Sequence, residues 1–410
     1  SNDPAAVMEA ILEEARRLTR EGLDLATDGR YVWAEKTSLG GDDCIAVAAA
    51  FAILADNSLS HPPLEVVITV DEETGMDGAV ALDCSDLKGR RLLNLDSEEE
   101  GVFTVSCAGG LRADCFVPAV KAPLTDEVCF AVSIGGLKGG HSGAEIDKGR
   151  GSGNDLISRV LYSAMERLGT LRIADLRGGQ FDNVICTRCD AVVAVPAGKA
   201  EDFAAFIREF DGILKNEYAA TDGGVTLTCA AADADAAYSA EDSSRLLHVL
   251  LTLPQGVEVM SADFPGLVQT SLNLGVMTAC GDGLHFSFSI RSSVATQKEL
   301  LLQRVRAIVE YTGGGTVSTR GDYPAWQYAR QSPLRDTVMA SYKQITGQDG
   351  VIMATHGGLE CGLLINKMPG LDAVSLGPEL HDIHSPRERL GVDSVKRMYA
   401  LVCEVLKNCR

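Results

Sequence analysis

The chain has 410 residues, of which 46% are hydrophobic and 23% charged, and its formal net charge at pH 7 is −20. No apolar run approaches the roughly 20 residues that a membrane-spanning helix needs, and so strong a negative charge repels nucleic acid and anionic membrane surfaces. Composition therefore argues against membrane and nucleic-acid partners, and the length predicts two globular domains.

The N-terminal stretch and the cysteines bear on where the protein works. Residues 4–20 predict an acidic amphipathic helix without the basic-then-apolar order of a signal peptide. Twelve cysteines are scattered through a chain much larger than a disulfide-stapled scaffold, and we expect them to be reduced. Cys186 and Cys189 should point to opposite faces of a strand, and with no second pair they favour ordinary packing over a zinc site. These features predict a cytoplasmic protein.

The first part of the chain alternates between helix and strand. An apolar run at 45–51 predicts a buried helix, and residues 64–70 and 91–95 predict strands. The same alternation returns after about residue 323. The elements expected there are helices over 332–345 and 392–408 and strands over 351–354 and 372–376. This pattern is typical of an α/β fold with a mostly parallel sheet.

The middle of the chain differs, because from about residue 111 it shows strands with alternating apolar residues, together with long helices. The expected helices cover 154–168, 200–214 and 296–311, and a hairpin turn is expected at 280–283. We therefore predict a discontinuous α/β domain made of residues 1–109 and 320–410. Residues 110–319 are predicted to form an inserted α+β domain.

Acidic residues gather just past predicted strands or at a helix start. They occur at 41–43, 71–75 and 94–100, and a fourth element, His384-Ser385-Pro386, follows the late strand. In an open α/β sheet, sites form at the carboxyl ends of strands. Carboxylate oxygens and imidazole suit zinc or a similar divalent metal. A single acidic cluster of this kind is more often a solvated turn. The hypothesis of a metal site therefore depends on all four elements occurring in this order along the chain.

Taken together, these motifs resemble those of the two-zinc aminoacyl-histidine dipeptidases. The matching residues are Asp42 after Leu39-Gly40-Gly41, the doublet Glu72-Glu73, Asp96 before Ser97-Glu98-Glu99-Glu100, and His384. The resemblance continues through 107–110, 136–143, 323–326 and 356–362 and covers roughly residues 22 to 410. It implies a zinc-peptidase-like catalytic domain and an inserted lid or dimerisation domain.

The resemblance also implies a role for each acidic residue. Asp42 would bridge two zinc ions, Asp96 would bind one of them, and Glu73 and His384 would bind the other. Glu72 would be the general base that takes a proton from the attacking water. An exchange of roles between Glu72 and Glu73 stays open.

The same resemblance points to residues outside the acidic clusters. His141 would stabilise the oxyanion, often from the neighbouring subunit of a dimer, which implies a homodimer. Asn183 and Arg291 would hold the substrate, and an arginine suits a free carboxylate. His356 and Glu360 would line the substrate pocket. An exposed loop histidine and strand-end polar residues are the plain structural alternatives.

One family element is missing, namely a His-x-Asp motif before Asp42 that completes the second metal site. Of the seven histidines, the earliest is His61, which follows Asp42. One metal position keeps Asp42, Glu73 and His384, whereas the other is left with Asp42 and Asp96. The zinc count could therefore be two, one or none. A fragment, an active variant with a replacement ligand and a catalytically silent relative are all compatible with this.

The leading functional hypothesis is metal-dependent hydrolysis of small dipeptides, with histidine as a possible second residue. A second hypothesis is a catalytically impaired relative that binds peptides or amino acids. A third is an amidohydrolase acting on acylated or carbamoylated amino acids, since one metal machinery cleaves several kinds of amide.

Overall fold

The structure is a computed structural model that describes residues 22–409. The helix expected over 4–20 lies outside the described residues. The described chain divides into two compact units, one made of 22–105, 329–353 and 364–409, the other of 106–328 and 354–363. This division differs from the predicted boundaries mainly in assigning 354–363 to the second unit.

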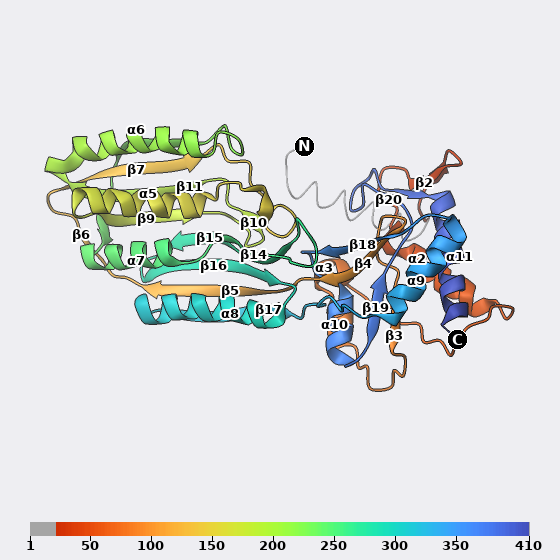
Figure 1. Ribbon diagram of the computed structural model, residues 1–410. Helices are drawn as coiled ribbons and strands as arrows, with labels where there is room; N and C mark the ends of the chain where they lie inside the picture. The colour runs from red at the N-terminus through yellow and green to blue at the C-terminus, as the bar shows by residue number, and fades with distance from the viewer. Residues whose placement is uncertain (1–21, 410) are drawn as a thin grey trace. The chain divides into compact units, whose positions relative to one another are not determined.

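The second unit is built on a nine-stranded antiparallel sheet (Figure 1). Its strand order is β12-β7-β11-β9-β15-β16-β5-β17, and β14 pairs with β15. The bounds are β5 Gly109–Pro118, β7 Glu127–Gly135, β9 Arg172–Gly178, β11 Cys189–Pro196, β12 Thr226–Ala232, β14 Gly256–Met260, β15 Val268–Ala279, β16 Gly283–Ser292 and β17 Thr316–Tyr323. Two short ladders join β8 Gly140–His141 to β10 Val184–Ile185, and β6 Lys121–Pro123 to β13 Ala236–Tyr238.

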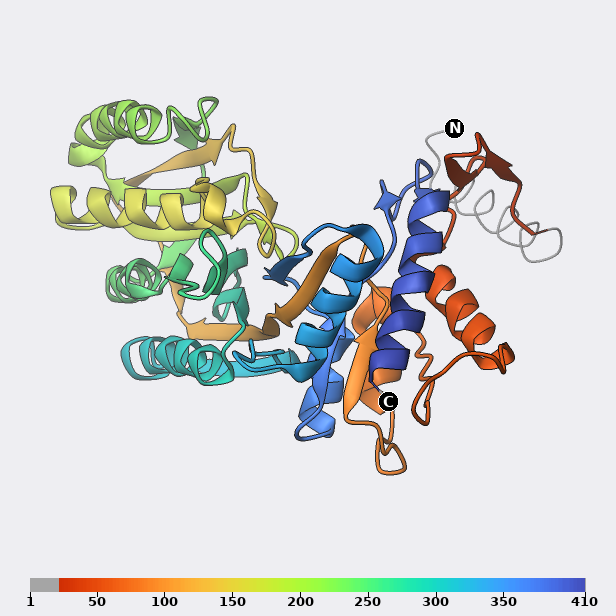
Figure 2. The ribbon, with the colours of Figure 1, turned by 45° about the vertical axis from the view of Figure 1, so that its right-hand side comes forward.

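Four helices cover one face of this sheet in both ribbon views (Figures 1 and 2). They are α5 Gly153–Leu168, α6 Ala200–Glu217, α7 Ala240–Thr252 and α8 Ala295–Arg306, with a π-helical turn η3 Ala307–Thr312 after α8 and 3-10 turns η1 Ile146–Lys148 and η2 Ala197–Lys199. Alternate residues of β5 are buried against the core, as expected for a sheet covered on one face. Phe203, Leu246 and Phe288 are among the buried side chains that form this core.

The first unit contains two four-stranded sheets, ordered β18-β4-β19-β3 and β1-β2-β21-β20. The strands are β1 Leu25–Thr27, β2 Tyr31–Ala34, β3 Arg91–Asn94, β4 Val102–Cys107, β18 Val351–Thr355, β19 Asp372–Ser375, β20 Leu380–His381 and β21 Arg389–Gly391, of which β4 and β18 end beyond the unit boundary. The helices are α2 Gly41–Ala55, α3 Glu72–Gly75, α4 Asp77–Ala81, α9 Pro333–Thr346, α10 Glu360–Lys367, which begins in the other unit, and α11 Val392–Asn408. Strands β3 and β19 are parallel, and β4 is antiparallel to β19.

Helix ends follow local sequence signals. At α9, the Ser332 hydroxyl accepts a hydrogen bond from Arg335 N at 3.0 Å, and Pro333 occupies the first turn. The helix ends at Gly347, whose φ of 74° is readily adopted only by glycine. These signals explain why the predicted helix over 332–345 matches the observed one so closely.

One expected strand is wrong. Residues 64–70 form no strand, and Val66, Ile68 and Val70 are 42%, 54% and 66% exposed. A strand needs a partner for its backbone hydrogen bonds, and none of the described strands pairs with this segment. Its run of β-branched residues at 66–70 therefore predicted a strand for which no described strand supplies a partner.

Two further expectations concern the chemistry of the whole chain. All twelve cysteines are free thiols, as predicted. Across residues 22–409, no helix combines the length and the apolar character needed to cross a bilayer.

Candidate functional site

Two helices and one loop of the first unit bring Asp42, Glu73 and His384 together. His384 Nε2 lies 2.7 Å from Glu73 Oε1 and 3.3 Å from Asp42 Oδ2. One donor atom from each of the three residues lies within 4.8 Å of the other two. Asp42 stands in the first turn of α2, Glu73 in α3, and His384 in the loop between β20 and β21. Residues more than 300 positions apart in sequence thus form one group of possible metal ligands.

Glu388 fixes the loop that carries Asp42. Glu388 is 3% exposed, and its carboxylate accepts backbone N–H bonds from Gly40 at 3.0 Å, Gly41 at 2.7 Å and Asp42 at 3.3 Å. This buried carboxylate therefore ties the start of α2 to the loop that follows His384. Sequence analysis missed Glu388, although an acidic residue four positions after His384 was visible there.

Asp96 joins the group from the end of β3. When protonated, it donates a hydrogen bond to the Asp42 carboxylate. Its loop is held by Ser375, whose hydroxyl lies 2.8 Å from Ser97 Oγ and donates to Asp96 O at 3.3 Å. Gly377 packs so closely that a Cβ there would meet Ser97 O. The end of β19 therefore sets the position of Asp96.

The adjacent glutamates Glu72 and Glu73 interact with different partners. The charge of Glu72 raises the pKa of Asp96, second only to burial, whereas the charge of Glu73 raises that of Asp42, again after burial. Burial opposes the charged form of His384, but its hydrogen bond to Glu73 and the charges of Glu73 and Asp42 outweigh burial and raise its pKa. Glu73 thus belongs with Asp42 and His384, and Glu72 is the carboxylate that acts on Asp96.

Crowded carboxyl groups give the metal-free protein a specific pH dependence. Burial raises the pKa of Asp43 to about 8, and burial followed by the Glu72 charge raises that of Asp96 to about 8. In the unfolded chain such groups titrate near pH 4. Between these values the folded chain holds protons that the unfolded chain has lost, so stability falls as pH rises from about 4 to about 8.

We therefore expect the melting temperature of chelator-treated protein to fall between pH 5 and pH 8. Added zinc should remove this fall, because metal binding favours the ionised carboxylates and the folded chain. The matched variant Asp43→Asn, which cannot ionise, should show a shallower fall. Differential scanning fluorimetry across this range measures the effect, and a melting temperature that rises with pH in chelator contradicts it.

The donors of this group fit zinc. Two carboxylates and one imidazole are ligands that Zn²⁺ accepts, and three protein ligands leave one position for water or substrate. Mutual repulsion among the ionised carboxylates also favours a divalent cation at this place. Sequence analysis expected Asp42, Glu73, Asp96 and His384 as ligands, and the structure brings all four together.

In the second unit, Arg291 lies in a row of residues across neighbouring strands. It pairs with Ser271 of β15 on one side and with Gly110 of β5 on the other, and Gly110 pairs in turn with Tyr323 of β17. A Cβ at Gly110 would lie 2.5 Å from the Tyr323 hydroxyl oxygen. Because Gly110 has no side chain, the Tyr323 ring reaches over it, and its hydroxyl lies 3.2 Å from Arg291 Nη1.

Arg291 is a buried cation without an anionic partner among the described side chains. It is 6% exposed, and its Nε is buried with no hydrogen-bond partner in the structure. Within residues 22–409, no acidic side chain forms an ion pair with it. A buried guanidinium normally pairs with an anion, since burying its charge alone costs several kcal/mol. The arrangement is therefore suited to an anionic ligand such as a carboxylate.

His356 lies next to this arginine. It is 6% exposed, its Nε2 is 2.7 Å from Ser271 Oγ, and its Nδ1 is buried without a partner among the described residues. Burial and then the charge of Arg291 lower its pKa to about 4. His356 is therefore neutral at pH 7. Glu360, expected beside it, begins α10 and is half-buried.

His141 is held in one tautomer by its own loop. The backbone N–H groups of Gly143 and Ala144 both donate to its Nδ1 at 3.2 Å, so the proton of the neutral ring is on Nε2. Burial and then Arg291 lower the pKa of His141, which favours this neutral form. A Cβ at Gly143 would lie 2.9 Å from the His141 ring and 3.3 Å from Arg291 Cζ, so both side chains flank this glycine.

Asn183 is placed by the backbone of the same loop. Ser142 N donates to Asn183 O at 2.9 Å, and Val184 pairs with His141 between β10 and β8. The amide of Asn273, 1% exposed, donates to the carbonyls of Asp182 and Val184 at 2.8 and 2.9 Å. Asn273 therefore holds the backbone on both sides of Asn183. The sequence alone did not point to Asn273.

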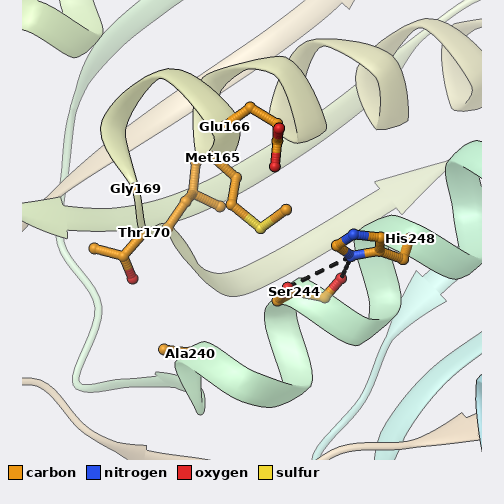
Figure 3. Close-up of a pocket in the computed structure, with 8 residues that line it drawn as sticks. Met165, Glu166, Gly169, Thr170, Ala240, Ser244 and His248 are labelled. Carbon is orange, nitrogen blue, oxygen red and sulfur yellow. Dashed lines mark hydrogen bonds between the residues drawn. The ribbon is translucent and has the colours of Figure 1, made fainter.

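A pocket of about 220 Å³ lies between α5 and α7 in the second unit (Figure 3). His248 Nδ1 donates to Ser244 O at 2.7 Å, which fixes its ring at the pocket edge. The lining residues are Met165, Glu166, Gly169, Thr170, Leu171, Ala240, Ser244 and His248. None of them was predicted as a functional residue.

A group of carboxylates with one imidazole, beside a further carboxylate that can serve as a base, is typical of metal-dependent hydrolases. Residues 37–408 match the peptidase family M20/M25/M40, and the chain belongs to this family. The mixed α/β fold class and the resemblance to aminoacyl-histidine dipeptidases are confirmed by the relatives described next.

Two relatives illustrate this membership, and a third protein shares the fold. The cytosol non-specific dipeptidase of Escherichia coli is 36% identical over 392 residues, covering 95% of this chain and 80% of that protein. The crystal structure of aminoacylhistidine dipeptidase from Vibrio alginolyticus superposes with a TM-score of 0.89 at 33% identity and the same coverage of 95% and 80%. Aminopeptidase PepT from Bacillus cereus, at 16% identity and a TM-score of 0.52, covering 95% of this chain and 76% of that chain, shares the fold.

Proposed function

We propose that this protein is a metal-dependent dipeptidase that acts on small unblocked peptides in the cytoplasm. The observation that carries the proposal is the convergence of Asp42, Glu73 and His384, whose donor atoms lie within 4.8 Å of one another. Two relatives at 36% and 33% identity, which bear dipeptidase names, support the class of substrate.

In this proposal Asp42, Glu73 and His384 hold a zinc ion, and Asp96 with Asp42 provides for a second one. Zinc bound there would polarise the scissile carbonyl and make water a stronger nucleophile at neutral pH. The carboxylates of Asp42, Glu73 and Asp96 would also balance the positive charge of the zinc, and together with His384 these side chains hold one another in place. Glu388 acts as a positioning residue, because it fixes the backbone that presents Asp42.

Glu72 is the proposed general base. Its carboxylate removes a proton from water as the water oxygen attacks the peptide carbonyl, and it then returns the proton to the departing amine. Glu72 lies in the same four-residue helix as Glu73 but acts electrostatically on Asp96. This separation supports one ligand and one base rather than two equivalent ligands.

Residues of the second unit are proposed to recognise the substrate. Arg291 binds the free carboxylate of the dipeptide, since its guanidinium is buried and lacks an acidic partner in the part of the chain that the structure describes. His141 donates its Nε2–H to the oxyanion, which its tautomer allows. Asn183, His356 and Glu360 line the place where the substrate binds. We further propose that the inserted unit serves as a lid and as a dimerisation surface in a homodimer.

A catalytically impaired peptide-binding protein is the second candidate. It is favoured by the donor geometry, because among the described residues of the first unit only one group of three ligands gathers. A binding protein would keep Arg291 and its neighbours and turn over no substrate. An amidohydrolase acting on acylated or carbamoylated amino acids would need the same carboxylates.

The test is metal content and turnover on the same preparation. After reconstitution with zinc, we expect at least one ion per chain and hydrolysis of Xaa-His dipeptides, with N-acyl and N-carbamoyl amino acids hydrolysed more slowly. Peptide binding by calorimetry without turnover would identify the binding protein. Faster turnover of the acyl amino acids would identify the amidohydrolase.

A further inference from the structure

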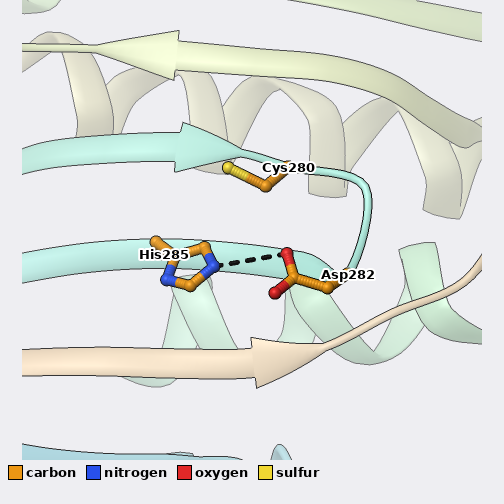
Figure 4. A group of neighbouring side chains, drawn as sticks. All are labelled: Cys280, Asp282 and His285. Atoms are coloured by element: carbon orange, nitrogen blue, oxygen red, sulfur yellow. Dashed lines mark hydrogen bonds and ion pairs between the residues drawn. The ribbon is translucent and has the colours of Figure 1, made fainter.

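The tip of the β15–β16 hairpin carries a second group of metal-binding side chains. Cys280, Asp282 and His285 each offer one donor atom, and these atoms lie within 4.8 Å of one another (Figure 4). They supply a thiol, a carboxylate and an imidazole, three different ligand types that zinc accepts together. None of these residues belongs to the group around Asp42.

The backbone of this turn is fixed before any ion binds. Cys280 N donates to Gly283 O at 2.8 Å, and the buried Tyr238 hydroxyl lies 2.5 Å from Cys280 O and 2.7 Å from Gly283 O. Ala119 N donates to Asp282 O at 3.0 Å. The turn is therefore held by its own closing bond, by Ala119 just after the neighbouring strand β5, and by the Tyr238 hydroxyl.

The side chains have distances and surroundings that suit a metal ion. His285 Nε2 and Asp282 Oδ1 are 3.4 Å apart, and two ligands on a tetrahedral zinc at about 2.0–2.1 Å are themselves roughly 3.4 Å apart. The Phe116 ring, with its centroid 4.7 Å from that of His285, limits rotation of the imidazole. Cys280 is half-buried, whereas Asp282 and His285 are exposed, so an ion and a water ligand can reach the site.

We propose that this hairpin binds a thiophilic divalent cation, with zinc as the expected ion. Cys280 Sγ, Asp282 Oδ and His285 Nε2 are the protein ligands, and water is the fourth. A thiolate and a carboxylate together balance the charge of a divalent ion. The thiolate favours zinc or cobalt over magnesium and calcium, which prefer all-oxygen sites.

Cobalt absorption separates this site from the carboxylate group. A thiolate ligand gives Co²⁺ an intense charge-transfer band in the near ultraviolet, and the ligands around Asp42 contain no sulfur. Reduced, chelator-treated full-length protein is titrated with Co²⁺. We expect the band to saturate at one equivalent of Co²⁺ per chain. It should be absent in Cys280→Ser, and added Zn²⁺ should abolish it by displacing the Co²⁺.

Matched variants complete the test. Cys44→Ser removes an exposed thiol next to Asp43 and should keep the band. His285→Ala should weaken Co²⁺ binding by more than about tenfold, whereas His248→Ala should leave it unchanged. The proposal is overturned if the titration gives no band, if the band survives Cys280→Ser, or if it is lost in Cys44→Ser. Because the band reports only sulfur ligation, failure here leaves the dipeptidase proposal untouched.

Discussion

Glu72→Gln is expected to reduce dipeptide turnover by roughly 10²- to 10⁴-fold, the usual contribution of a general base. The substitution keeps the size of the side chain and removes only its ability to accept a proton. Zinc content should stay unchanged, because Glu72 is not among the three clustered donors. Steady-state kinetics and metal analysis on the same sample measure both quantities.

Two matched variants make this expectation specific. Glu73→Ala removes the carboxylate that lies 2.7 Å from His384 Nε2, so it should lower zinc retention together with turnover. Glu99→Gln changes an exposed glutamate near Asp96 and should leave both unchanged. Full activity in Glu72→Gln would reject the assignment, and normal zinc retention in Glu73→Ala would reverse the proposed roles of the two glutamates.

Arg291→Lys is expected to weaken use of dipeptide substrates, with kcat/KM falling roughly 10- to 100-fold. Hydrogen bonds to charged groups contribute about 1.5–3 kcal/mol, and lysine cannot reproduce the bidentate geometry of a guanidinium. Arg291→Met should have a larger effect, since it also removes the charge. The loss should appear mainly in KM if the carboxylate is bound equally in ground and transition states.

A dipeptide and its C-terminal amide distinguish carboxylate recognition from a general defect. Wild-type protein should prefer the free acid strongly, and the Arg291 variants should lose this preference. Because Arg291 has no acidic partner within residues 22–409 that its loss would leave unpaired, the melting temperature should not fall as it would for a broken buried ion pair. The exposed pair Arg188–Asp190 offers a control, and Arg188→Lys should keep the preference for the acid. An unchanged preference in Arg291→Met contradicts the proposal.

Local sequence signals were sufficient for most of the helices. The predicted helices over 154–168, 200–214 and 392–408 correspond to α5, α6 and α11 within a few residues at each end. Each has a strong apolar stripe of the kind that helix packing requires. The hairpin turn at 280–283 was also found where expected, between β15 and β16.

The contacts that position the site could not be read from the sequence. Glu388 binds backbone groups about 350 residues earlier in the chain, and nothing in its own neighbourhood marks it as buried. Similarly, Tyr323 meets Arg291 only because Gly110 lies between them in the sheet register. The strand predicted over 64–70 failed for the opposite reason, because its β-branched run is typical of a strand but none of the described strands pairs with it.

The order of segments in the chain has a consequence for biosynthesis. Residues 106–328 form most of the second unit in one uninterrupted stretch, so this unit can gain most of its contacts while the chain is still growing. The first unit must wait, because β3 forms its parallel pair with β19, in which Asn94 lies opposite Ser375. Asp42, Glu73 and Asp96 therefore leave the ribosome long before His384 and Glu388. During that interval a nascent chain carries its acidic residues without the histidine and the buried carboxylate that later organise them.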